Sequence, residues 1–192
     1  MFEDICSSES APRERILSAA HRLFYGDGIR ATGIDRVIAE AGVTKVTFYR
    51  QFPSKDDLVL AVLERRHQRW LAWFTQALAR HGGTPAAVVP ALREWFADPG
   101  FRGCAFINSV GELGGALPAV VAAARAHKAD MTAALMRLLP PGADQAALAG
   151  AMALAVDGAI VQAQRGPSHE DALQSLAVLL QALAVSRTGV VG

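Results

Sequence analysis

The stretch AGVTKVTFYRQFPSKDDL, residues 41–58, decides how the rest of this sequence is interpreted. It combines a glycine, threonines, lysines, an arginine and several aromatic residues, and its acidic residues occur only in the last three positions. Gly42 suits the left-handed backbone that ends a helix, and Pro53 prevents a helix from continuing past it. The stretch therefore predicts a helix of scarcely two turns, over residues 44 to 50 or 51.

A second short helix is expected before the glycine turn. It opens at Thr32, where Asp35 three residues later makes a capping box possible, and it ends at Gly42. Two short helices joined by AGVT have the length and turn chemistry of a helix-turn-helix. Val43 is expected to fill the small core between them.

The helix at 44–51 has few positions available for a core. Val46 and either Phe48 or Tyr49 are expected to anchor it, and burial of both aromatic rings is the alternative. The residues left to point outward are Thr44, Lys45, Thr47 and Arg50. The N-terminus of this helix offers unpaired N–H groups and the positive end of the helix dipole, which suit a phosphate or a nucleic-acid groove.

Glycine, proline and capping residues divide the whole chain into helical pieces and leave no good strands. The chain is therefore predicted to be all-α, with about nine helices. A disordered tail is expected over residues 1–10. The expected helices run from Pro12 to the GDG turn at 26–28, then over 32–41, 44–51, 55–80, 86–97, 104–113, 118–139, 143–165 and 168–186, with Ser54 and Asp57 as a second candidate capping box.

The charge is distributed unevenly along the chain. Residues 13–55 contain eight Lys or Arg and four Asp or Glu, whereas residues 70–192 contain eight of each. A basic first quarter beside a neutral remainder indicates an anion-facing module joined to a part with another role. We expect the anion-facing helix-turn-helix domain to cover 11–56, with its connecting helix continuing to about residue 80 and a boundary at HGGTP (81–85). The remainder, 81–192, forms the second domain.

Several classes of protein are disfavoured by composition. Two cysteines are too few for a disulfide framework, and the first ten residues lack the pattern of a signal peptide, so a cytoplasmic protein is expected. The most apolar window, 146–161, is interrupted by Asp157, which argues against a membrane span. No hydrolase, P-loop or zinc-protease motif occurs, and the five histidines are scattered. We expect neither an enzyme nor a metal site, and no cofactor.

The segment ATGIDRVIAEAGVTKVTFYRQFPSKDDLVLAVLERR, residues 31–66, resembles the DNA-binding core of the tetracycline-repressor (TetR) family of bacterial regulators. The matching pieces are Thr32, IAEAGV (38–43), TFYRQF (47–52) and SKDDL (54–58). The preceding segment, 13–32, is similar to the family's first helix, including its Phe24-x-x-x-Gly28 ending. The resemblance implies a homodimer with an N-terminal three-helix DNA-binding domain and a variable helical ligand-binding domain.

The resemblance also implies roles for single residues. Thr32 and Lys55 are expected to bind DNA phosphates, and Tyr49 is expected to touch the DNA backbone through its hydroxyl. The residues expected near base edges and phosphates at the start of the recognition helix are Thr44, Lys45 and Thr47. Many family members have glycine where Val46 stands, so this chain departs from the family pattern at that position.

A ligand pocket is expected in the C-terminal part. The run RGC-x-F-x-N is similar to one that several TetR-like proteins carry at the start of the sixth helix, which lines the inducer cavity in the family. Apolar walls with a few polar groups make a small-molecule site. The candidate lining residues are Trp95, Phe96, Phe101, Cys104, Phe106, Asn108 and Met131, and a plain apolar core is the alternative. Cys104 is interpreted as a small hydrophobic residue, with redox or electrophile sensing as the alternative.

The last two helices carry apolar residues on more than one face, which exceeds what one intrachain contact needs. Such a face is best buried against a second copy, giving a two-fold four-helix interface, and the resemblance places the dimer contact there. The candidate interface residues are Leu148, Met152, Ile160, Leu173, Leu176 and Leu180.

The sequence as a whole indicates a homodimeric transcriptional regulator, a repressor released from a palindromic operator in double-stranded DNA by an unknown small-molecule effector. The alternative is a helical small-molecule-binding protein, or an interaction module, without DNA-binding output. Salt-dependent DNA affinity separates the two readings.

Overall fold

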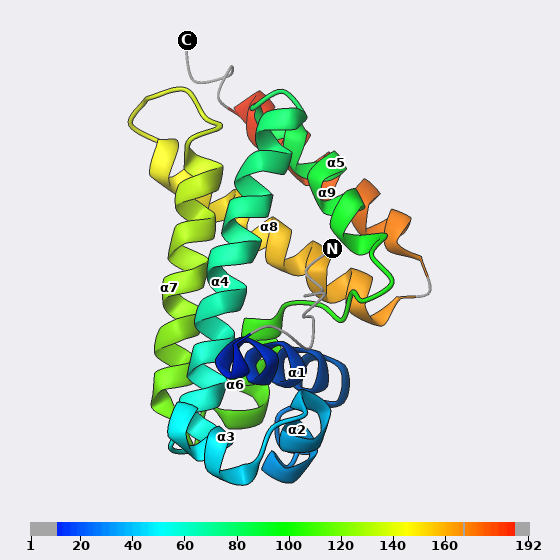
Figure 1. Cartoon of the computed structure of the whole chain (residues 1–192). Coiled ribbons are helices and arrows are strands. Elements are labelled where there is room, and N and C mark those ends of the chain that lie inside the picture. The colour runs from blue at the N-terminus through cyan, green and yellow to red at the C-terminus, as the bar shows by residue number, and fades with distance from the viewer. Residues whose placement is uncertain (1–10, 167, 187–192) are drawn as a thin grey trace. The chain divides into compact units, whose positions relative to one another are not determined.

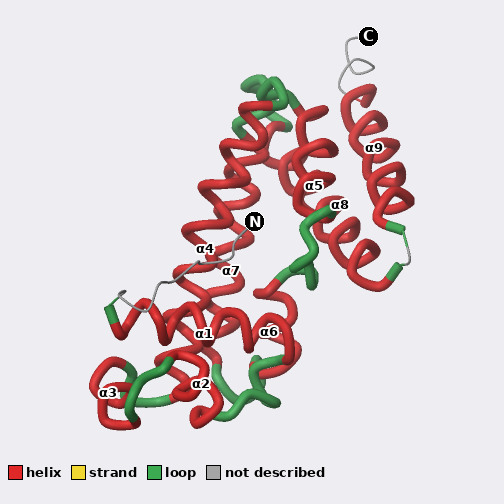
Figure 2. The backbone as a smooth tube through the Cα atoms, turned by 45° about the vertical axis from the view of Figure 1, so that its right-hand side comes forward, coloured by secondary structure: helices red, strands yellow, loops and turns green. Residues whose placement is uncertain are grey.

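The computed structural model describes residues 11–166 and 168–186, and throughout this part of the chain the regular elements are helices (Figure 1, Figure 2). The predicted all-α class is confirmed. The elements in chain order are α1 (Pro12–Asp27), α2 (Ile34–Ala41), α3 (Lys45–Gln51), α4 (Lys55–Arg80), the 3-10 turn η1 (Pro85–Ala87), α5 (Val88–Phe96), α6 (Ala105–Leu113), α7 (Pro118–Met136), α8 (Gln145–Arg165) and α9 (His169–Ser186). The predicted tail, 1–10, lies outside the described residues.

Capping chemistry explains where most of the N-terminal helices begin and end. Pro12 occupies the first position of α1, where its missing N–H costs nothing. Gly28 ends α1 with a φ of +95°, a value that disfavours residues with a side chain. At the start of α4, the Ser54 hydroxyl accepts the Asp57 N–H at 3.1 Å and donates to the Asp57 carboxylate at 2.7 Å.

The start of α2 differs from the prediction. The helix begins at Ile34 with Gly33 at its N-cap, and no side chain bonds to that cap. Thr32 does not form a capping box with Asp35, because its hydroxyl donates to the Gly28 carbonyl at 2.8 Å. The Thr32 side chain therefore stabilises the turn that precedes α2 instead of capping the helix.

The chain divides into two compact units. One holds the described residues up to Trp70 together with Ala105–Arg125, and the other holds Leu71–Cys104 and the described residues from Ala126 onward. This division groups α6 and the first part of α7 with the helix-turn-helix, which the sequence did not indicate. The predicted functional boundary at His81 stays a prediction.

The core of the first unit forms where α1 packs against α2 and α3. Phe48 of α3 is fully buried there, and complete burial of such a ring stabilises a fold by about 2–3 kcal/mol. Other buried residues of this unit include Ile16, Leu17, Ala20, Val37, Phe52 and Leu58. This core fixes the orientation of α3, and with it the residues that α3 exposes.

The second unit is built around α9, which packs on both α8 and α5. Arg93 of α5 also pairs with Glu170 of α9 at 2.7 Å. Lys128 of α7 bonds to Asp157 of α8, so the acidic residue within the most apolar helix is partnered. Among the described helices, only α8 has the length and apolar composition that a membrane span requires, and 39% of its most apolar window is buried inside the protein.

Candidate nucleic-acid interface

The turn between α2 and α3 depends on one glycine. Gly42 has a φ of +60°, in the left-handed region, and its N–H donates to the Ala39 carbonyl at 3.1 Å. The next N–H, of Val43, donates to the Ile38 carbonyl at 3.3 Å. These bonds close the end of α2 and reverse the chain into α3, as expected for a helix-turn-helix.

Thr44 caps the N-terminus of α3, as the sequence predicted. Its side-chain oxygen accepts the Thr47 N–H at 3.1 Å, and its hydroxyl lies 2.9 Å from that of Thr47. Both threonines therefore hold the first turn of α3 together. Their hydroxyls remain at the exposed end of the helix, where a further acceptor can be reached.

Fewer residues of α3 are buried than the sequence suggested. Phe48 is fully buried, whereas 72% of Val46 is exposed, so the prediction that Val46 anchors the helix is wrong. Residues two apart lie about 200° apart around a helix. Once Phe48 faces the core, Val46 must face away from it. An exposed valine on α3 is a feature that the sequence analysis missed.

The outward face of α3 carries cationic and aromatic groups. The side chain of Lys45 is 67% exposed and lies 3.8 Å from the Asp35 carboxylate, a loose surface pair. Arg50 is exposed as well, at the last turn of the helix. Tyr49 is 42% exposed, and its ring meets Phe48 edge-on at 5.3 Å. The Tyr49 ring is therefore braced by the core while part of it faces outward.

The predicted phosphate contact of Thr32 needs correction. Its side chain is fully buried, and its hydroxyl donates to the carbonyl oxygens of Gly28 and Leu23, at 2.8 and 3.4 Å. A hydroxyl committed to two internal acceptors and closed off from solvent is not placed to bind DNA. Thr32 instead fixes the turn that precedes α2.

Lys55 stands at the N-terminus of α4, as predicted, and is half-buried. Its Nζ donates to the Ile29 carbonyl at 2.6 Å. An ammonium group has three donors, so this bond leaves donors for a phosphate. The bond also holds the amine in one place, which lowers the entropic cost of a further contact.

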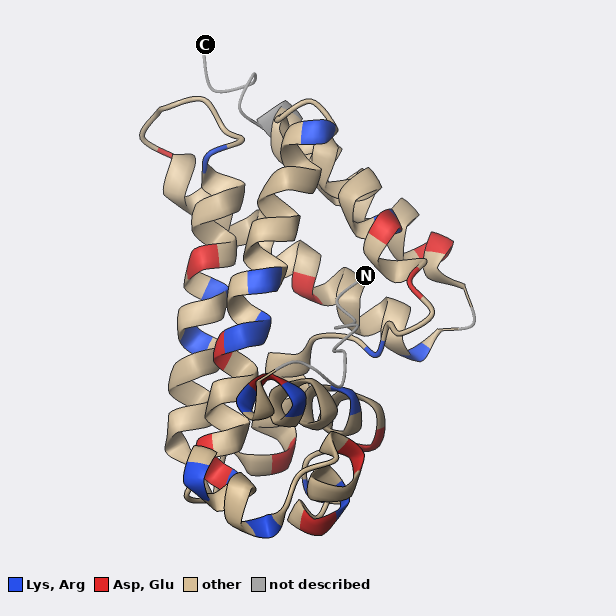
Figure 3. Ribbon diagram, in the orientation of Figure 1, with Lys and Arg blue, Asp and Glu red and all other residues tan. Residues whose placement is uncertain are grey.

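The acidic residues of the basic segment 13–55 are all paired in the structure. The ion pairs are Glu14–Arg65 at 3.1 Å, Asp27–Arg36 at 2.7 Å, Asp35–Lys45 at 3.8 Å and Glu40–Arg22 at 2.8 Å. Figure 3 shows these acidic residues interleaved with Lys and Arg over the N-terminal helices. The positive excess of this segment is therefore carried by other basic residues, among them Arg13, Arg30, Arg50 and Lys55.

The residues predicted to line a ligand pocket fall in both compact units. Phe106 and Asn108 belong to the first unit, and Trp95, Phe96, Phe101, Cys104 and Met131 belong to the second. In the second unit, the Phe101 ring lies 4.9 Å from that of Phe96 and 5.3 Å from that of Trp95. His169 of α9 joins this cluster, 5.5 Å from Phe101, which the sequence did not indicate.

The residues predicted for a dimer interface are mostly turned inward. Leu148 is half-buried, and the other five, Met152, Ile160, Leu173, Leu176 and Leu180, are buried within the protomer. Other apolar residues of α8 and α9 face outward instead, including Leu154, which is 78% exposed, and Leu179, which is 50% exposed. Neither was selected as an interface residue from the sequence, because a helix that is apolar on all sides does not show which of its faces remains uncovered.

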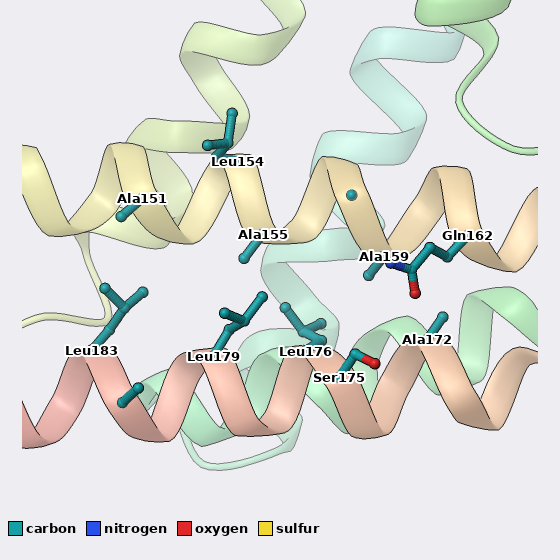
Figure 4. A pocket seen from close by; sticks show the side chains of 12 residues that line it. Ala151, Leu154, Ala155, Ala159, Gln162, Ala172, Ser175, Leu176, Leu179 and Leu183 are labelled. Atoms are coloured by element: carbon teal, nitrogen blue, oxygen red, sulfur yellow. The ribbon is translucent and has the colours of Figure 1, made fainter.

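An apolar groove of about 410 Å³ runs between α8 and α9. Alanines of α8 form one wall, and Leu176, Leu179 and Leu183 point toward them from α9 (Figure 4). Ser175 and Gln162 are the polar side chains among its lining residues. Within the described residues, no group of three or more His, Cys, Asp or Glu side chains is placed to hold a metal ion.

Comparison with known proteins agrees with this geometry. The sequence profile of the family described as bacterial regulatory proteins, tetR family, matches residues 16–62. The crystal structure of SCO4454, a TetR-family transcriptional regulator from Streptomyces coelicolor, is similar with a TM-score of 0.79 and 34% sequence identity. That similarity covers 90% of this chain and 96% of the other.

Two relatives known by sequence match over shorter spans. An uncharacterized HTH-type transcriptional regulator from the lacX 3' region of Lactococcus lactis is 28% identical over 106 residues, which are 53% of this chain and 54% of that protein. The HTH-type transcriptional activator FasR of Mycolicibacterium smegmatis is 39% identical over 66 residues, which are 34% of this chain and 30% of FasR. The matches thus span about half of one relative and less of the other. Taken with the helix-turn-helix geometry and the similarity along almost the whole of SCO4454, they show that the chain belongs to the TetR family of bacterial transcriptional regulators.

Proposed function

We propose that this regulator is a homodimeric repressor that binds a palindromic operator through α3 and leaves it when a small apolar molecule binds the second unit. One observation carries the DNA-binding part of the proposal. The short helix α3 is fixed by the burial of Phe48 and the Thr44 cap, and it directs Lys45, Val46 and Arg50 outward. A helix of this kind has the size and charge to enter the major groove N-terminus first.

The contacts divide into those that position and those that specify. Lys45 and Thr47, at the start of α3, are assigned to base edges, and Val46 is assigned to the methyl group of a thymine, which apolar side chains recognise. Thr44 and Tyr49 are assigned to the DNA backbone. Arg50 and Lys55 add charge-assisted contacts to phosphates, which raise the affinity for every sequence. Thr32 keeps a structural role.

The groove between α8 and α9 supports the homodimer. Leu154 and Leu179 lie at this surface and are largely exposed in the single chain, and the groove beside them is almost entirely apolar. A second copy of the same two helices would cover it in a two-fold arrangement, since a self-complementary apolar face is the usual basis of a closed dimer. Such a dimer carries two copies of α3, as a palindrome with two half-sites requires.

The effector part of the proposal rests on the aromatic cluster of Trp95, Phe96 and Phe101. Its rings pack directly on one another, and the His169 imidazole joins them. A small, mostly apolar molecule that inserts among such rings would meet apolar surfaces with one polar group beside them. The effector releases DNA only if it binds the non-binding state of the dimer more tightly than the operator-bound state. Because it acts on the chromosome, we place the protein in the cytoplasm.

The proposal is tested by selecting bound fragments from bacterial genomic DNA and measuring affinity for the enriched sequence over a range of salt concentrations. We expect a steep fall of affinity with salt, a preference for a palindrome over its half-site, and repression of a reporter that carries the operator. The absence of any salt-dependent affinity for DNA would favour the alternative of a small-molecule-binding protein or interaction module. Activation of the reporter would support the proposed DNA binding but contradict the proposal that the protein is a repressor.

A further inference from the structure

Glu112, in the last turn of α6, is bound to a turn of the DNA-binding unit more than eighty residues away in sequence. Its Oε1 accepts the Ile29 N–H at 3.1 Å, and its Oε2 accepts the Arg30 N–H at 2.8 Å. Figure 1 and Figure 2 both show α6 beside α1, whose end leads into this turn. Both carboxylate oxygens are thus used in charge-assisted hydrogen bonds, the stronger kind.

The turn has the form of a carboxylate-binding site. Successive backbone N–H groups that point the same way make a concavity suited to an anion. Gly28 precedes them with a φ of +95°, and a Cβ added there would lie 3.2 Å from Glu112 Oε2. The backbone angle favours glycine at this position, and a Cβ there would force the Glu112 carboxylate to move by a few tenths of an ångström.

One peptide group of this turn connects Glu112 to Lys55. The peptide between residues 29 and 30 donates its N–H to Glu112 and accepts the Lys55 ammonium on its carbonyl, at 2.8 and 2.6 Å. Hydrogen bonds in such a chain polarise and strengthen one another. If the peptide rotated, both bonds would be lost together. The Ile29 carbonyl also accepts the Thr32 N–H at 3.3 Å, so Glu112 holds the N–H side of a peptide whose carbonyl receives Lys55.

We propose that Glu112 is a positioning residue for DNA binding, through which α6 controls the orientation of Lys55. The inference rests on the proposed function, in which Lys55 binds a phosphate. Withdrawal of the carboxylate leaves the N–H groups of Ile29 and Arg30 without their acceptor, so the peptide between them is held only through its carbonyl, which accepts the Thr32 N–H at 3.3 Å and the Lys55 ammonium.

The test compares Glu112→Gln, which keeps the length of the side chain but removes its charge and one acceptor, with Glu64→Gln. Glu64 is an exposed carboxylate of the same unit that bonds to Gln68 in the next turn of its own helix, so it is a matched control. We expect Glu112→Gln to weaken operator binding about tenfold, and Glu64→Gln to leave it unchanged. Amide NMR should show faster hydrogen exchange at Ile29 and Arg30 in Glu112→Gln alone.

A double-mutant cycle with Lys55→Ala separates positioning from a general loss of stability. If Glu112 acts through Lys55, its substitution should cost much less affinity in the Lys55→Ala background than in wild type. Additive losses, or unchanged exchange at Ile29 and Arg30, would overturn the inference while wild-type DNA binding stands. Should Glu112→Gln lose its helical circular dichroism, Glu112→Asp withdraws the same carboxylate by one methylene and is expected to show the same coupling. Wild-type protein that binds no DNA in a salt-dependent manner would overturn the proposed function itself.

Discussion

Thr44 and Thr47 close the first turn of α3 on itself. The Thr47 N–H donates to Thr44 Oγ1 at 3.1 Å, and the two hydroxyl oxygens lie 2.9 Å apart. The same two side chains lie at the end of the helix that is proposed to enter the groove. Stability of the recognition helix and contact with DNA therefore depend on the same atoms.

Substitution of the cap should lower both the stability of the fold and the affinity for DNA. Thr44→Ala removes the oxygen that accepts the Thr47 N–H, so it should lower the free energy of unfolding by about 1 kcal/mol and weaken operator binding. Thr44→Ser keeps the oxygen and should remain close to wild type in both. Urea unfolding and titration with operator DNA measure the two effects. Equal behaviour of the alanine and serine variants would contradict the cap's role.

The exposure of Val46 predicts a contact with a thymine methyl group. Replacing one operator thymine at a time by deoxyuridine removes only that methyl, and one position should weaken wild-type binding by about 1 kcal/mol. Val46→Ala should bind the normal operator more weakly and become indifferent to the same replacement. If every thymine can be replaced without effect, Val46 does not read the base.

Lys55 should contribute affinity without sequence preference. Lys55→Ala is expected to weaken binding to strong and weak operator variants by the same factor, and to reduce the slope of log affinity against log salt by about one for each subunit. Gln68→Ala, on the exposed side of the same helix, serves as the control. If the slope of log affinity against log salt is unchanged in Lys55→Ala, Lys55 does not bind a phosphate.

The apolar face of α8 and α9 should control the oligomeric state. Leu179→Glu places a charge in the groove that a second copy is proposed to cover, so light scattering should show a shift from dimer to monomer and operator affinity should fall. Gln174→Glu adds the same charge on an exposed part of α9 that does not line the groove. It should remain dimeric. If both variants remain dimeric, the dimer interface does not involve the groove between α8 and α9.

Glu94 should make stability weakly dependent on acidity. A hydrogen bond from His81, at 2.6 Å, and a further one from Arg80 lower the pKa of Glu94 below its ordinary 4.5. A depressed pKa stabilises the fold above the unfolded-state value, and this contribution disappears as the pH falls through the folded value. Because the group is partly exposed, the contribution is at most about 1 kcal/mol. Wild type should exceed Glu94→Gln in unfolding free energy near neutral pH, and this difference should shrink as the pH falls below 4.5. A difference that persists in acid would contradict this origin.

The sequence predicted those features that depend on neighbours along the chain. Gly42, Thr44 and Pro53 act within one helical turn, so the bounds of α3 could be inferred from them. Phe48 and Val46 show the limit of this reasoning. Either could have anchored so short a helix, and only the position of α1 decides which one is buried.

Contacts between distant segments could not be inferred in the same way. The pairing of Glu112 with Ile29 and Arg30 spans more than eighty residues and involves backbone groups, which carry no signature in the sequence. The role of Thr32 was also predicted wrongly. A threonine at the start of a helix can direct its hydroxyl to the helix or to the preceding turn, and the sequence does not show which. In the alanine-rich α8, apolar residues on all sides hide the face that remains exposed.

The central claim is that two copies of α3 enter the major groove of one duplex. Methylation protection at the N7 atoms of operator guanines tests it most directly, because these atoms lie in the major groove. The account predicts two protected clusters, related by two-fold symmetry and separated by about one helical turn or a multiple of it, both lost in Lys45→Ala with Thr47→Ala. Protection of a single cluster, or bound DNA with no protected guanine in the major groove, would contradict it.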